Sequence, residues 1–178
     1  MPAGGAGLFV VGSYVPKSTA QLNALLAQGD VVPVEVDVAA LLDARRAGTI
    51  AQAIAETEAG LAAGRTTVVY TSRTLITAEE ATRSLDIGAQ VSAALVAIVR
   101  GLSLRPRYLV AKGGITSSDV ATQGLGVRKA QVLGQILPGV PVWRTGPESR
   151  HPGLVYVVFP GNVGDDQALV TVQRRLHL

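Results

Sequence analysis

Short apolar runs alternate along the chain with longer segments in which apolar positions recur at helical spacing. The runs predict strands at Leu8–Val11, 31–38, 66–71 and Tyr108–Lys112, and several more over 130–160. Strands separated by helices are typical of an α/β domain. We therefore expect a single domain with a three-layer-like arrangement, in which a mostly parallel or mixed sheet carries helices on its faces.

Helical segments are expected between and after these strands, because residue types that cap helix N-termini precede several of them. We expect helices over 18–29, over 39–64 with an interruption near Gly48, from Thr77 to about Arg100, from Thr116 to about Gly124, and from Asp165 or Asp166 to about Leu176. The first would begin with a capping box over 18–21, S-T-A-Q. In the helix after Thr77, Glu79 and Glu80 occupy the first turn. Pro33 indicates that strand 31–38 lies near a sheet edge.

The most specific local signal is the segment 111–120, A-K-G-G-I-T-S-S-D-V, which follows a buried strand and precedes a helix. The paired Gly113 and Gly114 permit a positive φ and remove the Cβ atoms that would keep a ligand from the backbone. A helix start offers unpaired N–H groups and the positive end of its dipole, which suit a phosphate. An ordinary capped turn fits the same pattern. The segment is not a Walker A loop, and no G-x-G-x-x-G stands at this turn.

Two further turns follow expected strands. Gly12 and Ser13 come after Leu8–Val11, and Gly161 and Asn162 come after the apolar run that ends at Pro160. In open α/β sheets, ligands bind beyond the carboxyl ends of the strands, so this shared position indicates a nucleotide site. Taken alone, each turn equally satisfies local backbone geometry.

Together with the segment 138–143, P-G-V-P-V-W, and Gln21, these motifs resemble the C-terminal nucleotide-binding domain of the four-carbon acid sugar kinase family. The resemblance runs from about Leu8 to about Leu176. Members of the family phosphorylate small sugar acids such as tetronates with ATP. The resemblance thus implies ATP and Mg²⁺ as cofactors. It assigns nucleotide contacts to Ser13, Gly113, Gly114, Ile115, Thr116 and Gly161. Lys112 and Asn162, which stand next to these residues, are weaker candidates.

Several side chains near these motifs have two interpretations. Many family members carry Glu where this chain has Ile115, so only the backbone role carries over to that position. Lys112 would either reach a phosphate or pair with Asp119 or another carboxylate. Asp119 would cap a helix or help to bind Mg²⁺ through water. Trp143 would pack against the Pro-rich turns or stack on adenine. No residue of the chain stands out as a catalytic base.

Composition excludes several classes of protein. The 178 residues include no cysteine, which excludes disulfides and thiolate chemistry and favours a cytoplasmic location. The net charge of +3 is small, and the arginines are scattered along the chain without interleaved aromatics, so we expect no nucleic acid partner. The longest apolar stretch, 91–99, is too short to span a bilayer, and residues 1–7 do not form a signal peptide. Those first residues are expected to be flexible. The two histidines are not at metal-ligand spacing.

Kinases of this family also have an N-terminal domain that holds the sugar acid and the base, and no counterpart to it fits this sequence. The chain is therefore expected to be the ATP-binding half of such a kinase, meeting its partner domain in cis or in trans and inactive alone. A non-catalytic nucleotide-binding or sensor module that retains the fold is the alternative. An enzyme acting on another anionic substrate is a third possibility. The chain is also a candidate homo-oligomer.

Overall fold

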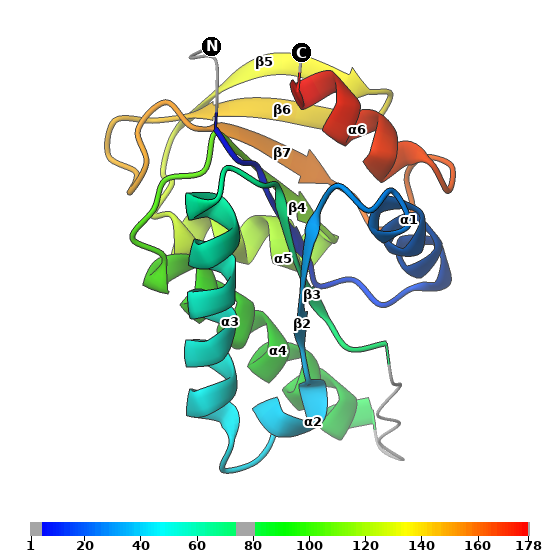
Figure 1. Ribbon diagram of the computed structural model, residues 1–178, viewed down its shortest axis with the longest axis vertical. Helices are drawn as coiled ribbons and strands as arrows, with labels where there is room; N and C mark the ends of the chain where they lie inside the picture. The colour runs from blue at the N-terminus through cyan, green and yellow to red at the C-terminus, as the bar shows by residue number, and fades with distance from the viewer. Residues whose placement is uncertain (1–4, 74–80, 178) are drawn as a thin grey trace.

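The computed structural model describes residues 5–73 and 81–177, and these form one mixed sheet with helices on both faces (Figure 1). The strands are β1 (Leu8–Val11), β2 (Val32–Val36), β3 (Thr67–Thr71), β4 (Tyr108–Lys112), β5 (Ala130–Leu137), β6 (Val140–Thr145) and β7 (Val155–Phe159). Their order in the seven-stranded sheet is β2-β3-β1-β4-β7-β6-β5. The expected single-domain α/β class with a mixed sheet is confirmed.

The parallel part of the sheet carries the predicted site. Strands β2, β3, β1, β4 and β7 run parallel, whereas β6 and β5 are antiparallel additions beside β7. β4, which precedes the glycine pair, is the middle strand. β2 lies at the edge, as Pro33 predicts. The carboxyl ends of β1, β4 and β7 are therefore neighbours.

Two apolar cores hold the helices against the sheet, because successive strand residues point to opposite faces. On one face, Phe9 and Val11 pack with residues of α1 (Pro16–Leu26) and α6 (Ala168–His177). On the other face, Leu8 and Val10 pack in the core formed by α3 (Arg46–Ala62), α4 (Ala81–Gly101) and a π-helical turn, η1 (Val120–Gly124). The short α2 (Val38–Leu41) follows β2, and α5 (Gly114–Asp119) leads directly into η1. Figure 1 shows α1 and α6 together on one side of the sheet.

The predicted start of the first helix and the predicted interruption of the second helical segment are wrong. The first helix begins at Pro16, because proline lacks an N–H and suits the first helical position; its N-cap is Val15, without a side-chain cap. Ser18 therefore lies inside the helix, and the expected capping box is absent. The second helical segment is interrupted by residues 42–45 and not at Gly48, which lies within α3. At the interruption, the Asp43 carboxylate accepts a hydrogen bond from the Arg45 N–H, a turn that competes with the helix.

The helix after the glycine pair starts earlier than predicted. It begins at Gly114 with Gly113 as N-cap and no side-chain cap, so Thr116 and Asp119 lie inside it. The expected role of Asp165 is supported, because its carboxylate accepts a hydrogen bond from the Gln167 N–H just before α6.

The remaining expectations concern the ends of the described ranges. The predicted cap at Thr77, with Glu79 and Glu80, lies outside the described residues. Of the segment 1–7, residues 1–4 also lie outside them, whereas Ala6 and Gly7 are buried. Across the described residues, every helix is too short or too polar to cross a membrane.

Candidate functional site

Three of the predicted site segments meet at the carboxyl edge of the sheet. The Ser13 N–H donates to the Lys112 carbonyl at 3.4 Å, which joins the end of β1 to the end of β4. The Gly113 N–H donates to the Phe159 carbonyl at 2.8 Å, which joins β4 to β7. Ser18 Oγ lies 2.9 Å from Ser13 Oγ and 3.1 Å from the Gly161 carbonyl oxygen. The structure thus brings Ser13, Gly113 and Gly161 together, as their shared position after parallel strands predicts.

Of the two paired glycines, only Gly113 has a backbone conformation that requires glycine. Gly113 has φ +119°, and a Cβ there would lie 3.1 Å from the Ser13 Cβ. Gly114 has no left-handed φ, and a Cβ there would enter open space. A positive φ at Gly114 is therefore not required by this fold. Gly12, which the motif assignment omits, has no room for a Cβ because Thr116 Oγ1 packs against its backbone.

The remaining residues of the glycine-pair segment divide into supporting and exposed positions. Thr116 is buried against Gly12 and Gly113, and the buried Ser117 donates to the Ala111 carbonyl at 2.7 Å. These buried contacts hold the turn at Gly113 against the end of the sheet. Ile115 is 72% exposed, and Tyr14, directly after Ser13, is 63% exposed. Two apolar side chains are therefore accessible from solvent beside the site, and no motif in the sequence marks Tyr14.

Ser13 is held at every polar backbone atom. Its carbonyl accepts a hydrogen bond of 2.6 Å from Arg73 Nη1, while Arg73 Nη2 donates to the Val11 carbonyl at 3.3 Å. Burial lowers the pKa of Arg73, and its Nε is buried without a partner among the described residues. Sequence reasoning missed Arg73, because the contact joins positions sixty residues apart and no local motif marks it.

Lys112 is fully buried, and its ammonium lies between backbone carbonyls and an aromatic ring. Nζ donates to the Pro160 carbonyl at 2.8 Å and to the Gly161 carbonyl at 2.9 Å, and it lies 4.2 Å from the centroid of the Phe159 ring. Burial, and to a smaller extent the charge of Lys17, lowers the pKa of Lys112 to about 8. The ammonium therefore gains its stabilisation from carbonyl dipoles and a π face.

The alternative in which Lys112 pairs with Asp119 is wrong. The Asp119 carboxylate accepts instead from Ser92 Oγ at 2.5 Å and from Gln123 Nε2 at 3.2 Å. Asp119 ends α5 and so is not an N-cap of that helix either. Its oxygens already have protein donors, which weakens its case as a Mg²⁺ ligand.

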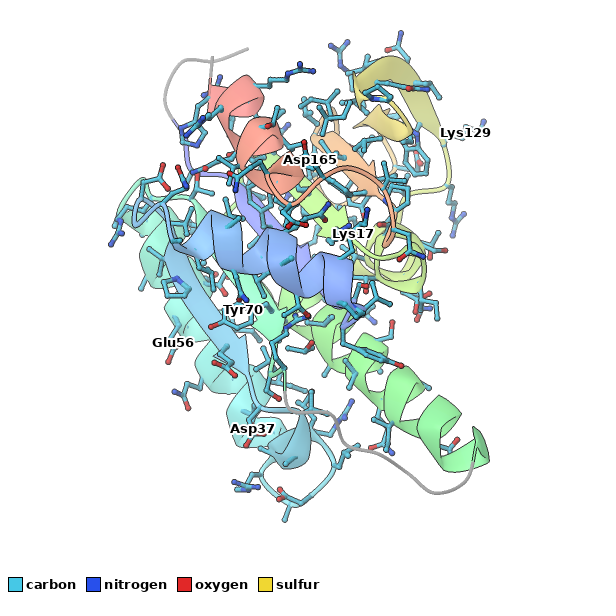
Figure 2. The ribbon with its side chains drawn as sticks, turned by 90° about the vertical axis from the view of Figure 1, so that its right-hand side faces the viewer. Lys17, Asp37, Glu56, Tyr70, Lys129 and Asp165 are labelled. Atoms are coloured by element: carbon cyan, nitrogen blue, oxygen red, sulfur yellow. The ribbon has the colours of Figure 1, made fainter. Side chains whose placement is uncertain are left out.

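The loop after β7 is held by the first turns of α1. Gln21 Nε2 donates to the carbonyls of Val163 at 2.9 Å and Asp165 at 2.8 Å, and Lys17 Nζ donates to the Gly164 carbonyl at 3.1 Å. Figure 2 shows Lys17 on α1 beside the loop that leads to Asp165. Asn162 is exposed on this loop. The Gln21 that accompanies the family motifs therefore has a structural reason: it fixes the loop that follows Gly161.

Trp143 lies away from this edge. It stacks on Tyr156, with ring centroids 6.1 Å apart and an interplanar angle of 24°. Tyr156 pairs in register with Leu109, three residues before Lys112, so the indole is well removed from the carboxyl ends of the strands. The structure therefore does not support adenine stacking for Trp143, whose aromatic partner is Tyr156.

Two surface hollows also lie away from the site, between β2 and α3. One of about 400 Å³ is lined by residues including Val32 and Arg65, and one of about 560 Å³ by residues including Asp37 and Glu56. Neither contains a motif residue. The candidate site is thus defined by backbone geometry and the buried Lys112 at the carboxyl edge, and neither hollow coincides with it.

The sequence pattern of the family described as "Nucleotide-binding C-terminal domain" matches residues 8–169. This match confirms the resemblance that the motifs predict. A comparison with curated proteins finds no match.

Among solved structures, the fold resembles a domain of unknown function from Bordetella bronchiseptica, described as a domain-swapped dimer with bound citrate, at 23% identity and a TM-score of 0.72. It also resembles a Haemophilus influenzae protein of the same domain family at 20% identity and a TM-score of 0.71. The alignments cover 98% and 99% of this chain but 42% of each of those chains. The chain therefore spans less than half the length of these relatives.

Proposed function

We propose that this chain, which belongs to the nucleotide-binding C-terminal domain family, is the ATP-binding half of a four-carbon acid sugar kinase. The observation that carries the proposal is the convergence of Ser13, Gly113 and Gly161 at the ends of three adjacent parallel strands. The buried Lys112 beside them supplies a positive charge with no carboxylate partner among the described residues. A phosphate chain supplies the complementary charge.

The residues present fit ATP. The N–H groups at the start of the helix that begins at Gly114 have no partners within that helix, and the exposed backbone of Gly114 leaves them open to approach. Ser13 Oγ would donate to a phosphate oxygen, and Lys112 would offset the phosphate charge. Tyr14 and Ile115 would offer apolar surface to the base. Bound Mg²⁺ would neutralise charge on the phosphates; we expect it to be held mainly by phosphate oxygens and water, as is common for this ion.

The proposed reaction is transfer of the γ-phosphoryl group of ATP to a hydroxyl of a tetronate or 3-oxo-tetronate. The hydroxyl oxygen forms a bond to the γ-phosphorus as the bond to the β–γ bridging oxygen breaks, and a base takes the hydroxyl proton. We place that base and the sugar-acid site in an N-terminal domain that meets this chain in cis or in trans. Phosphoryl transfer depends mainly on positioning and charge stabilisation across the assembled cleft, so the chain alone is expected to be inactive.

The assembly and location of the protein belong to the same proposal. We expect a cytoplasmic protein with a nucleotide and a sugar-acid-binding domain as partners, and without nucleic acid or membrane partners. The Bordetella relative is described as a domain-swapped dimer, which supports a homo-oligomer for this chain as well.

Calorimetric titration with ATP, ADP and NAD in the presence of Mg²⁺ tests the nucleotide specificity. We expect binding of ATP and ADP in preference to NAD, because the site offers one phosphate-facing edge and no G-x-G-x-x-G turn follows β4. Binding of NAD without binding of either adenine mononucleotide would refute the proposal.

A non-catalytic nucleotide-binding or sensor module is the second candidate. The observation that favours it is the engagement of Asp119, the carboxylate nearest in sequence to the glycine pair, by Ser92 and Gln123. This candidate predicts ATP binding but no phosphorylation even when a family N-terminal domain is supplied, whereas the kinase predicts both.

A further inference from the structure

The loop that follows β7 turns its carbonyl groups toward the protein. Over residues 160–165, every carbonyl except that of Asn162 accepts a hydrogen bond from a side chain of β4 or α1. The donors are Lys112 for Pro160 and Gly161, Gln21 for Val163 and Asp165, and Lys17 for Gly164. Each of these donors therefore fixes the orientation of a peptide plane.

This carbonyl orientation determines where the N–H groups point. In a planar trans peptide, the carbonyl and the N–H of the next residue point in opposite directions. No peptide bond within the described residues is cis. The N–H groups of Gly161 and Asn162 therefore point away from the Lys112 ammonium. Neither has an acceptor within the part of the chain that the structure describes. Consecutive unpaired N–H groups on a turn form a concave binding place for an anion.

We propose that Lys112 is a positioning residue, which orients the peptide planes on both sides of Gly161 so that the Gly161 and Asn162 N–H groups bind the phosphate chain of the nucleotide. The inference rests on the proposed nucleotide site. It adds Lys112 as the side chain that orients the part of the site in the loop after β7. Ser18 contributes to the same orientation, since it lies 3.1 Å from the Gly161 carbonyl oxygen. In this loop the backbone N–H groups of Gly161 and Asn162 contact the phosphate, and Lys112 binds the carbonyls on the opposite side of the same peptide planes.

A lysine suits this position for steric reasons. Its ammonium is compact and carries three N–H donors, so it serves two adjacent carbonyls while the Phe159 ring lies against it. A planar guanidinium is larger and holds its donors in a fixed fork, so we expect arginine to displace the loop. Methionine fills a similar volume but leaves both carbonyls without this donor.

The charge of Lys112 should also make ATP affinity depend on pH. Among the described groups, Lys17 of α1 is the charged residue whose field acts on it, and from β7 it meets the uncharged Phe159. Because the pKa of Lys112 is lowered to about 8, the unliganded site loses this positive charge as pH rises through that value. A bound phosphate favours the protonated form. ATP affinity should therefore fall between pH 7 and pH 9, and this fall should disappear when the lysine is replaced.

Calorimetric titration of the full chain with Mg²⁺ and ATP at pH 7 and pH 9 tests the inference on four variants. We expect Lys112→Met to bind ATP at least tenfold more weakly than wild type at pH 7 and to show no further fall at pH 9. Lys112→Arg should also bind ATP more weakly than wild type, although it keeps the positive charge. Lys129→Met removes one positive charge just before β5, which is the edge strand beyond β7 and β6, and should keep the wild-type affinity and pH dependence (Figure 2). Asn162→Pro removes one proposed N–H donor on an exposed loop and also fixes the φ of that residue. We expect it to bind ATP about tenfold more weakly than wild type, and it decides the matter if Lys112→Met does not fold.

Each outcome has a distinct meaning. If wild type does not bind ATP, the proposed function fails and this inference fails with it. If wild type binds ATP and folded Lys112→Met binds with the same affinity and the same pH dependence, the positioning role is overturned and the proposed function stands. Unchanged binding by folded Asn162→Pro overturns the proposed amide contact in the same way.

Discussion

Replacing Gly113 with alanine should destabilise the fold, whereas changing its neighbour should not. Gly113 has φ +119° and ψ 145°, a region that residues with a Cβ occupy only under strain. The added Cβ would also lie 3.1 Å from the Ser13 Cβ and 3.3 Å from Thr116 Oγ1. Backbone strain of this kind costs about 1–3 kcal/mol. For a domain of this size that free energy corresponds to a fall in Tm of roughly 2–12 °C.

Gly114→Val is the matched comparison. Gly114 has no left-handed φ, its Cβ would meet nothing within 4 Å, and it stands at the first helical position. We expect the unfolding free energy of Gly114→Val to lie within about 1 kcal/mol of wild type, because β-branched residues and glycine differ by less than that in helix propensity. ATP binding should nevertheless be lost, since the branched side chain projects into the open space where the phosphate must approach the backbone.

Thermal unfolding followed by circular dichroism, together with ATP titration, separates the two effects. Gly113→Ala should show the lower Tm, and Gly114→Val should show near-normal stability with impaired binding. Equal Tm values for Gly113→Ala and wild type would refute the strain argument. Normal ATP affinity in Gly114→Val would show that the second glycine does not face the ligand.

Three further predictions concern the neighbouring contacts and catalysis. Ser13→Ala should weaken ATP binding by about 1 kcal/mol, roughly fivefold in Kd by titration, because one hydrogen bond is removed; an unchanged Kd would return Ser13 to a structural role. Arg73→Leu should lower the unfolding free energy by about 1–3 kcal/mol in urea melts, because the carbonyls of Ser13 and Val11 lose a charged donor; an unchanged midpoint would contradict that contact. The isolated chain should not phosphorylate erythronate, threonate or their 3-oxo forms in a coupled ADP-release assay, and a family N-terminal domain added in trans or fused should restore turnover, since proximity supplies about 7–11 kcal/mol of barrier reduction. Robust turnover by the chain alone would mean that it contains a base of its own.

The strands and the position of the site were predictable because both depend on local pattern. Strands buried on both faces read as continuous apolar runs, as β1 and β4 do, and Pro33 marks the edge strand β2. The rule that ligands bind at the carboxyl ends of parallel strands then brings Ser13 and Gly161 together without knowledge of any contact.

Contacts between distant segments were not predictable from local pattern. Ser18 fits a capping box in sequence, but Pro16 starts the helix two residues earlier and leaves the hydroxyl to bind across the site. Lys112 stands near Asp119 in sequence, yet the strand's direction carries its side chain to the loop after β7. Arg73 reaches Ser13 only because β3 and β1 are paired. In each case the partner is set by the sheet order.

Amide chemical-shift mapping of the ¹⁵N-labelled chain with Mg²⁺ and ATP tests the nucleotide site most directly. The largest changes should fall on the backbone amides of Gly114, Ile115, Gly161 and Asn162, at the carboxyl ends of β4 and β7. The amides of Val32 and Glu56, which line the hollows between β2 and α3, should change little. Changes centred on β2 and α3, or no saturable change at the four predicted amides, would contradict the account.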